Sequence, residues 1–233
     1  MRTRRGRLVP RTTLARCSAL VVLVMVMVTG LALVGCVRTS GGAWYVSSAP
    51  LPEGWPELTP VGEVRIRAYP NHRAARTTRA LADIDDERDG TGRMFRVLFE
   101  HIKQNDIAMT APVDMGYPTT GDVASAGGMS SMAFLYRTND LGETGSEGMV
   151  RIEDVPRATY ASVGVRGGYG QTNFEKGLAK VRAWLDTQDT WTPDGPPRYL
   201  GYNGPFTPWF MRYGEVQVPV IERDILAPSL DPS

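Results

Sequence analysis

Few side chains in this chain of 233 residues are suited to covalent or metal chemistry. There are two cysteines, Cys17 and Cys36, and two histidines, His72 and His101. They form no cluster with the spacing of a zinc site. Because an isolated histidine does not define a site, we expect a solvated or edge position for each histidine rather than a ligand position.

Motifs for catalysis are also missing from the sequence. Ser162 and Thr110 fall in predicted strands with no histidine nearby along the chain, and there is no Gly-x-Ser-x-Gly or phosphate-binding loop. The glycine-rich segment at 164–170 (GVRGGYG) lacks the spacing of a dinucleotide fingerprint and is predicted to be a strand-to-helix turn. We therefore expect a binding protein and no enzyme.

The N-terminus has the pattern of a signal peptide over residues 1–35. Six arginines and no acidic residue are followed by an apolar run from Ala19 to Val34, which is marginal for the about 20 residues that span a bilayer. The run ends in LVGC at 33–36, which resembles the lipobox of bacterial lipoproteins. This resemblance implies cleavage before Cys36, with diacylglycerol on its thiol and an acyl chain on its amine. The alternative is an uncleaved anchor helix, and both interpretations attach the domain to a membrane.

The expected location is the cell envelope, as a lipoprotein facing the periplasm. Val37, rather than an aspartate, follows the cysteine, which resembles lipoproteins sorted to the outer membrane. Cleavage would remove Cys17 and leave no disulfide. It would also remove six of the 26 basic residues, so that 20 remain against 25 acidic ones and the net charge becomes −5. A mildly acidic domain is a poor candidate for binding nucleic acid.

The rest of the chain is predicted to be one domain with two flanking segments. Residues 36–61, rich in Gly, Ser and Pro, are expected to form the lipidated cysteine and a flexible tether. Residues 62–222 are long enough for one domain with a core and too short for two. A C-terminal tail is expected at 223–233.

Hydrophobic periodicity predicts two helices among short strands. The first helix, over 93–104, has an apolar stripe of Phe95, Leu98, Phe99 and Ile102. The second begins at a Thr172-x-x-Glu175 capping box and has an apolar face of Phe174, Leu178, Val181 and Leu185. Strands are predicted at 64–69, 73–78, 107–113, 132–137, 150–152, 198–203 and 215–220. Residues 83–89 and 116–131 are expected to be a solvated acidic loop and a mobile loop.

The two halves of the domain share an order of elements. Val150–Ile152 with Pro156 repeats the residues and the spacing of Val64–Ile66 with Pro70. We therefore expect an α+β fold: a distorted antiparallel β-barrel of two pseudo-repeated ββαββ halves, with two flanking helices and a cleft where the halves meet.

Two long strings resemble the SOUL haem-binding protein family. They are FRVLFEHIKQNDIAMTAPV at 95–113 and GYNGPFTPWFMRYGEVQVPV at 201–220, and the second matches the family's closing signature, a turn followed by Arg-x-x-Glu-Val. The resemblance covers about residues 62–221. It implies a distorted barrel with two helices, and a domain that binds haem or another tetrapyrrole.

The resemblance also implies where the ligand binds. In the family, the first helix and the loop before the last strand frame the pocket, and haem needs an apolar cleft with basic residues at its rim. The predicted binding residues are Arg96, Phe99, Lys103, Met109, Phe206, Trp209 and Phe210. The alternatives are that Arg96 and Lys103 are solvated helix charges and that the aromatic residues form a hydrophobic plug. Met109 and Met115 could face the cleft as soft ligands, and the alternative is that they fill core space. Ala68 stands where better-studied members carry an axial histidine, so histidine ligation is not expected.

Two other functions remain open at this point. One is a structural or interaction lipoprotein whose cleft is filled. The other is a binder of small amphipathic cations through Glu215, since multidrug-sensing effector-binding domains resemble this duplicated architecture and use a buried glutamate. In the alternative interpretation, Glu215 is an exposed acid on the last strand.

Overall fold

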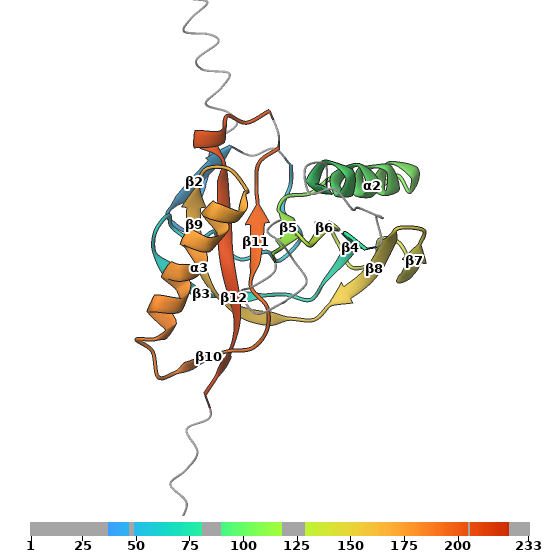
Figure 1. Ribbon diagram of the computed structural model, residues 1–233. Helices are drawn as coiled ribbons and strands as arrows, with labels where there is room; N and C mark the ends of the chain where they lie inside the picture. The colour runs from blue at the N-terminus through green and yellow to red at the C-terminus, as the bar shows by residue number, and fades with distance from the viewer. Residues whose placement is uncertain (1–36, 47–48, 81–89, 118–128, 205, 224–233) are drawn as a thin grey trace, which may run out of the picture. The chain divides into compact units, whose positions relative to one another are not determined.

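The computed structural model describes residues 37–46, 49–80, 90–117, 129–204 and 206–223. The predicted signal peptide, Cys36 and the acidic loop at 83–89 lie outside the described residues, as do most of the loop at 116–131 and of the tail at 223–233. From Arg38 onward the chain forms one compact unit, shown in Figure 1.

The unit is built on a mostly antiparallel sheet of ten strands. They are β3 (Val64–Tyr69), β4 (His72–Thr78), β5 (Val113–Gly116), β6 (Ser131–Leu135), β7 (Gly145–Glu147), β8 (Val150–Val155), β9 (Ala158–Arg166), β10 (Trp191–Pro193), β11 (Arg198–Gly201) and β12 (Tyr213–Glu222). Their order is β3-β9-β12-β11-β5-β6-β4-β8-β7, and β10 pairs with the end of β12.

The sheet is open, so the α+β class is confirmed and the expected closed barrel is not formed. The order ends at β3 on one side and β7 on the other, and these two strands do not pair. β7 has three residues, all exposed, and is too short and too polar to close the sheet against β3. Without β7 and β10 the order is β3-β9-β12-β11-β5-β6-β4-β8. It is symmetric about the central β11–β5 pair: β12 corresponds to β6, β9 to β4 and β3 to β8.

The second helix, α3 (Gln171–Leu185), packs on β9 and β12 through the predicted face. Phe174, Leu178, Val181 and Leu185 are all buried. Gly177 allows close contact, because a Cβ atom there would lie 2.5 Å from Cγ2 of Val216. The predicted capping box is wrong: the N-cap is Gly170, with no side-chain cap, and Thr172 lies inside the first turn.

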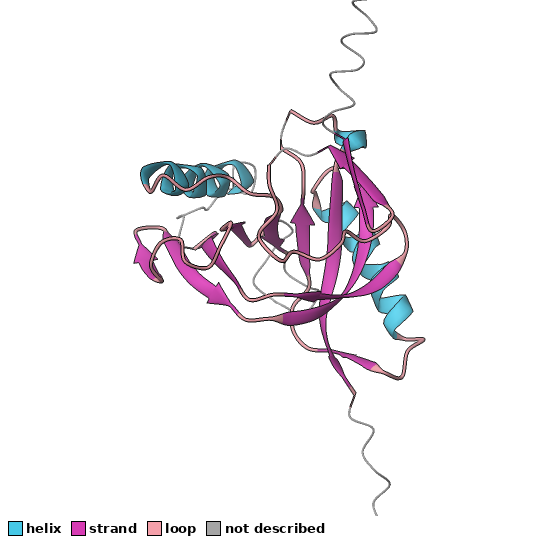
Figure 2. Cartoon of the chain, turned by 180° about the vertical axis from the view of Figure 1, so that it is seen from behind, coloured by secondary structure: helices cyan, strands magenta, loops and turns pink. Residues whose placement is uncertain are grey.

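The first helix, α2 (Gly90–Gln104), packs on β4 and β6 with a face rotated from the predicted stripe. Met94, Leu98 and Ile102 are buried, whereas Phe99 is 47% exposed. His101 is buried as well, with Nε2 2.8 Å from the Tyr136 hydroxyl and Nδ1 3.1 Å from the Glu147 carboxylate. These polar partners make burial of the imidazole acceptable, and the expectation that His101 is solvated was wrong. Figure 2 shows the two helices on separate parts of the sheet.

The strand predicted at 107–113 is wrong over most of its length. β5 begins only at Val113. In the preceding irregular segment, the Thr110 hydroxyl donates to the carbonyl of Leu135, and the backbone N–H of Ala111 donates to the carbonyl of Pro50. Pro112 has no N–H to give to a sheet, and neither of these two hydrogen bonds belongs to a pairing between strands.

The segment expected to be a flexible tether carries structure from Val37 onward. It forms the two strands β1 (Val37–Ser40) and β2 (Ala43–Val46), and it buries Tyr45 and Leu58 against Leu200, Tyr202 and Tyr213. The apolar contacts of these two side chains with the sheet explain why the Gly, Ser and Pro content did not leave the segment unstructured. Neither α2 nor α3, the two α-helices among the described residues, is long and apolar enough to cross a bilayer.

Candidate functional site: an open cleft beside a buried glutamate

The two faces of β12 have different chemistry. Side chains alternate along a strand, and Val216, Val218 and Val220 belong to the main core, on which α3 packs. Tyr213, Glu215 and Gln217 point to the other face and are also buried. The polar residues of this second face lie under the N-terminal segment and lead to the candidate site.

Glu215 is fully buried, which excludes the interpretation as an exposed strand acid. Its carboxylate accepts five hydrogen bonds, from the backbone N–H of Thr59 (2.6 Å), the hydroxyls of Tyr213 (2.8 Å), Tyr69 (3.0 Å) and Tyr202 (3.0 Å), and Nε2 of Gln217 (2.9 Å). A buried carboxylate with this many donors is satisfied by the chain itself.

The tyrosines around Glu215 are held in the protonated, donating form. Burial raises the pKa of Tyr69 and of Tyr202 well above the ordinary value, and the nearby Glu215 carboxylate raises both further. The pKa of Tyr213 is raised by the same two causes, in the same order. The three hydroxyls thus keep their protons at physiological pH, and none is a candidate phenolate. Those of Tyr69 and Tyr202 donate to Glu215, and the single proton of Tyr213 is shared between Glu215 and the carbonyl of Thr59 (2.6 Å).

Residues from the N-terminal segment cover this carboxylate. Thr59 donates its N–H to Glu215 and its hydroxyl to Ser162. The Trp55 ring packs edge-on against Tyr69 at 4.8 Å between centroids, and its Nε1 donates to the Tyr202 hydroxyl. The glutamate is therefore closed off by residues 43–46 and 49–59, which we call the N-terminal cover.

Gln217 links the closed glutamate to an arginine at the wall of a cleft. Its Nε2 donates to Glu215, and its Oε1 accepts from Nε of Arg198 at 2.9 Å. The Arg198 guanidinium lies 4.0 Å from the ring centroid of Tyr160, and its Nη1 lies 3.7 Å from Asp114. Its Nη2 is buried and has no hydrogen-bond partner among the described residues. Arg198 therefore carries unmet donor capacity beside the cleft.

The cleft has a volume of about 1490 Å³ and takes its walls from both halves of the sheet. Aromatic rings in its lining come from Tyr69, Tyr117, Tyr160 and Trp191. The basic lining residues are Arg76, Arg157 and Arg198, and the acidic ones are Asp114, Glu153, Asp194 and Glu222. Arg76 is paired with Glu153 at 2.6 Å and with Asp114 at 3.4 Å, whereas Arg157 is exposed.

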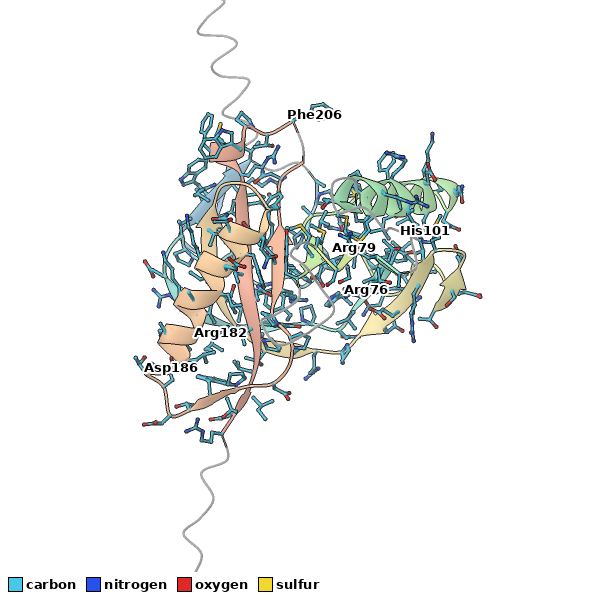
Figure 3. All side chains as sticks on the ribbon, in the orientation of Figure 1. Arg76, Arg79, His101, Arg182, Asp186 and Phe206 are labelled. Atoms are coloured by element: carbon cyan, nitrogen blue, oxygen red, sulfur yellow. The ribbon has the colours of Figure 1, made fainter. Side chains whose placement is uncertain are left out.

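None of the seven binding residues predicted from the sequence lines this cleft, although all seven are described. Arg96, Phe99 and Lys103 are exposed on α2, and Met109 is partly buried against the main core. Phe206, Trp209 and Phe210 are 99%, 68% and 60% exposed, so the interpretation as a hydrophobic plug is wrong. Figure 3 shows Phe206 projecting outward from its loop, whereas the labelled Arg76 is a lining residue of the cleft.

Other predictions made from single residues have mixed outcomes. Ala68, where the SOUL resemblance implies an axial histidine in other members, lines the cleft. His72 is the first residue of β4 and is buried, contrary to the expected solvated turn. Met115 lies in the main core and, like His72, is not a lining residue. No group of three or more His, Cys, Asp or Glu among the described residues is placed to hold a metal ion.

Sequence reasoning missed the cleft residues Tyr69, Arg157 and Arg198. A signal for the polar face was present in EVQVPV at 215–220, where Glu215 and Gln217 alternate with valines that the core requires. Such alternation predicts a polar face on a buried strand. The cleft itself has no local signal, because its lining comes from many separate strands.

Solved structures with a similar fold have little sequence in common with this chain. The C-terminal domain of EcmrR matches with a TM-score of 0.52 and 13% identity, over 69% of this chain and 98% of that domain. EcmrR in a complex with DNA matches with a TM-score of 0.50 and 15% identity, over 68% of this chain and 57% of that one. At these identities the likeness shows the fold alone.

Sequence comparison identifies the family. No curated protein is significantly similar to the chain. The family described as SOUL heme-binding protein matches residues 57–219, which include α2, α3 and the whole main sheet except the last three residues of β12. The chain therefore belongs to the SOUL haem-binding family.

Proposed function

We propose that this protein binds haem or another tetrapyrrole in the open cleft, and that it does so without a bond from the protein to the metal. The observation that carries the proposal is the cleft of about 1490 Å³ with aromatic walls and arginines. Among the residues that the structure describes, none fills this cleft, which does not favour a purely structural lipoprotein. Ligand pockets usually have volumes of about 300–1,000 Å³, so the space is sufficient for a flat macrocycle.

The chemistry of the walls suits a flat apolar ring. Tyr160 and Trp191 present rings, and Pro196, Pro197 and Val220 add apolar surface. Aromatic and apolar side chains stabilise such a ligand mainly by burying its faces. The position of Ala68 supports this location, because the SOUL resemblance places the axial histidine of haem-ligating members there and Ala68 is in the lining.

The residues that line the cleft do not favour an axial bond from the protein to the metal of the tetrapyrrole. The lining contains no histidine, methionine or cysteine, and the sequence 118–128, which lies outside the described residues, contains none either. Burial raises the pKa of Tyr117 to about 12, so its phenolate is not available as a ligand near neutral pH. Tyr69 is already committed to Glu215.

Arginines would hold the two carboxylates of the ligand. Arg157 is the basic lining residue whose exposed guanidinium is most accessible to a ligand, and Arg198 has an unsatisfied donor. Guanidinium–carboxylate pairs are among the strong, directional hydrogen bonds in proteins. The acidic residues Asp114 and Glu153 are both paired with Arg76, and Asp114 also lies 3.7 Å from Arg198.

The proposal includes the cell envelope as the place of action. The signal peptide at 1–35 and the lipobox-like LVGC at 33–36 support lipidation of Cys36 and attachment to a membrane, with the domain facing the periplasm at the outer membrane. The symmetric strand order around the β5–β11 pair supports two pseudo-repeated ββαββ halves that meet at the cleft. A lipid-anchored domain of this kind would take part in tetrapyrrole handling at the envelope.

A titration of the chain from residue 37 onward with hemin tests the proposal. We expect a saturable shift of the Soret band at one ligand per chain, and Arg157→Glu should weaken binding about tenfold because it turns an attraction for a carboxylate into a repulsion. The matched control is Arg96→Glu with Lys103→Glu, which reverses charge on α2 outside the cleft. Absence of saturable binding would refute the function, and a loss in the α2 variant alone would move the site to the predicted helix flank.

A second candidate function is the binding of small amphipathic cations through Glu215. The specific observation in its favour is the full burial of a carboxylate among Tyr45, Tyr69, Tyr202 and Tyr213. A cation would have to displace the N-terminal cover and compete with five donors. This candidate predicts that binding of a cationic hydrophobic dye is abolished by Glu215→Gln, while the tetrapyrrole proposal predicts no such dependence.

A further inference from the structure

Four large aromatic side chains are exposed on one edge of the molecule. They are Trp44 (44% exposed), Phe206 (99%), Trp209 (68%) and Phe210 (60%), which we call the aromatic edge. Single exposed apolar residues are ordinary, but a cluster of exposed aromatic rings marks an interaction surface.

Arg166 holds the two parts of this edge together. Its Nη2 donates to the backbone carbonyl of Trp44, and its Nη1 donates to the carbonyl of Met211 at 3.2 Å. Its guanidinium lies 3.6 Å from the centroid of the Trp44 ring. Met211 ends the 3₁₀ helix η1 (Trp209–Met211), so Trp44 on β2 lies next to Trp209 and Phe210. Figure 1 shows η1 beside β2 at the same end of the unit.

The chain enters the folded unit at this edge. β1 and β2 pair with each other and are joined by Gly41 and Gly42 alone, and two paired strands joined by so short a turn are antiparallel. The start of β1 therefore lies beside Val46, the end of β2. The carbonyl of Val46 accepts from Nδ2 of Asn203 at 2.5 Å, and Asn203 opens the loop that carries Phe206. The residue directly before β1 is Cys36, the predicted site of lipidation.

The charge around the aromatic edge differs from that of the whole chain. Segments 37–46 and 202–212 contain Arg38 and Arg212 and no acidic residue. After removal of the predicted signal peptide the chain has a net charge of −5, with 25 acidic residues placed elsewhere. An apolar, aromatic edge with basic flanks is complementary to an anionic lipid surface.

We propose that the aromatic edge inserts into the interface of an anionic bilayer and fixes the orientation of the domain there. Tryptophan and phenylalanine favour the boundary between headgroups and acyl chains. The lipid on Cys36 would retain the protein at the membrane. Contact of the aromatic edge with the bilayer would then fix the orientation of the domain and not its attachment. This inference rests on the membrane location in the proposed function and not on the ligand.

The orientation has a consequence for the cleft. β12 begins at Tyr213, next to η1, and ends at Glu222, which lines the cleft together with Pro219, Val220 and Ile221. A ten-residue strand spans roughly 30 Å. With the aromatic edge in the interface, this end of the cleft lies away from the bilayer, and the ligand would enter from the aqueous side.

Vesicle binding by the unlipidated chain from residue 37 onward tests the inference. We expect co-sedimentation with vesicles of phosphatidylcholine and phosphatidylglycerol, and weaker binding to phosphatidylcholine alone. The triple variant Phe206→Ser, Trp209→Ser, Phe210→Ser should reduce the partition coefficient at least about tenfold, because three rings no longer transfer out of water. The matched control, Phe99→Ser with Met149→Ser, removes two exposed apolar side chains from α2 and from the turn before β8 and should bind as the parent does.

Tryptophan fluorescence gives a second readout. Quenching by brominated lipid should fall in Trp209→Phe while the vesicle affinity is kept, since phenylalanine still inserts but does not fluoresce in the tryptophan band. The inference is overturned if the parent chain does not bind anionic vesicles, if the triple variant binds them equally well, or if the triple variant loses only hemin binding or only self-association. Failure of the tetrapyrrole proposal would appear separately, in the hemin titration and its Arg157→Glu variant.

Discussion

The buried Glu215 and the cleft beside Arg198 are joined through one glutamine, yet they differ in how their polar atoms are satisfied. Glu215 accepts five hydrogen bonds from the chain and lies under the N-terminal cover. Arg198 keeps a buried donor without a partner among the described residues, at the wall of a cleft of about 1490 Å³. A group whose hydrogen bonds are complete stabilises the fold, whereas an incomplete one beside open space is suited to a ligand.

The largest expected effect is the loss of stability when the buried carboxylate of Glu215 is removed. In Glu215→Ala the three tyrosines and Gln217 lose their common acceptor, and we expect the free energy of unfolding to fall by about 4 kcal/mol. Urea denaturation measures this loss. The control Glu222→Gln changes an exposed acid on the same strand and should shift stability by less than about 0.5 kcal/mol. Equal stability of Glu215→Ala and the parent would show that the carboxylate is not a structural element.

A somewhat smaller loss of stability is expected when a buried side chain of the N-terminal cover is shortened. Leu58 is 1% exposed and packs on the aromatic cluster around Glu215. Leu58→Ala should cost about 3 kcal/mol through lost burial and the cavity that remains. Val61→Ala, at a position 47% exposed, is the control and should cost much less. If Leu58→Ala is as stable as the control, the N-terminal cover does not pack as the structure has it.

The smallest effect concerns His72, which packs against the N-terminal cover and is affected by the charge of Arg198. Its ring packs edge-on against Trp55 of the cover. Burial lowers its pKa, and the positive charge of Arg198 lowers it further, against an opposing hydrogen bond to Pro70. Below about pH 6.5 the unfolded chain takes up a proton that the folded chain resists, so this part of the stability is present above that pH and is lost as the pH falls through the folded pKa.

Unfolding free energies at about pH 7.5 and about pH 5.5 test this assignment. Between them the parent chain should lose about 1 kcal/mol more than His72→Gln, because the variant lacks the imidazole of His72, which titrates in this range when the chain is unfolded, while His101 is present in both proteins. Carboxylates contribute equally to both proteins and cancel in the difference. An identical loss in both would mean that His72 is protonated as readily in the folded chain as in the unfolded one.

The sequence predicted those parts of the fold whose signal is local. The face of α3 follows from the spacing of Phe174, Leu178, Val181 and Leu185, and β3 was predicted with its observed bounds. The face of α2 was predicted less well, because burial of His101 depends on Tyr136 and Glu147, which lie far along the chain. The SOUL resemblance supplied the family, and the structure left the sheet open where a barrel was expected.

The candidate site was harder to predict, for a physical reason. Arg198 and Tyr160 are brought together by pairing of β11, β12 and β9, whose register no local pattern specifies. The cover over Glu215 comes from a segment whose composition is typical of a linker, and its contacts with residues far along the chain, such as Tyr202 and Tyr213, order it. The predicted roles of Arg96, Lys103 and the aromatic loop in ligand binding stay predictions.

The most direct test of the central claim is a comparison of hemin with metal-free protoporphyrin on the same chain. If the cleft holds the ring by its walls and by Arg157, without an axial bond, the two ligands should bind with dissociation constants that agree within about threefold, and Arg157→Glu should weaken both equally. Binding of hemin at least about a hundredfold tighter than the metal-free ring, with a spectrum of ligated iron, would contradict this account.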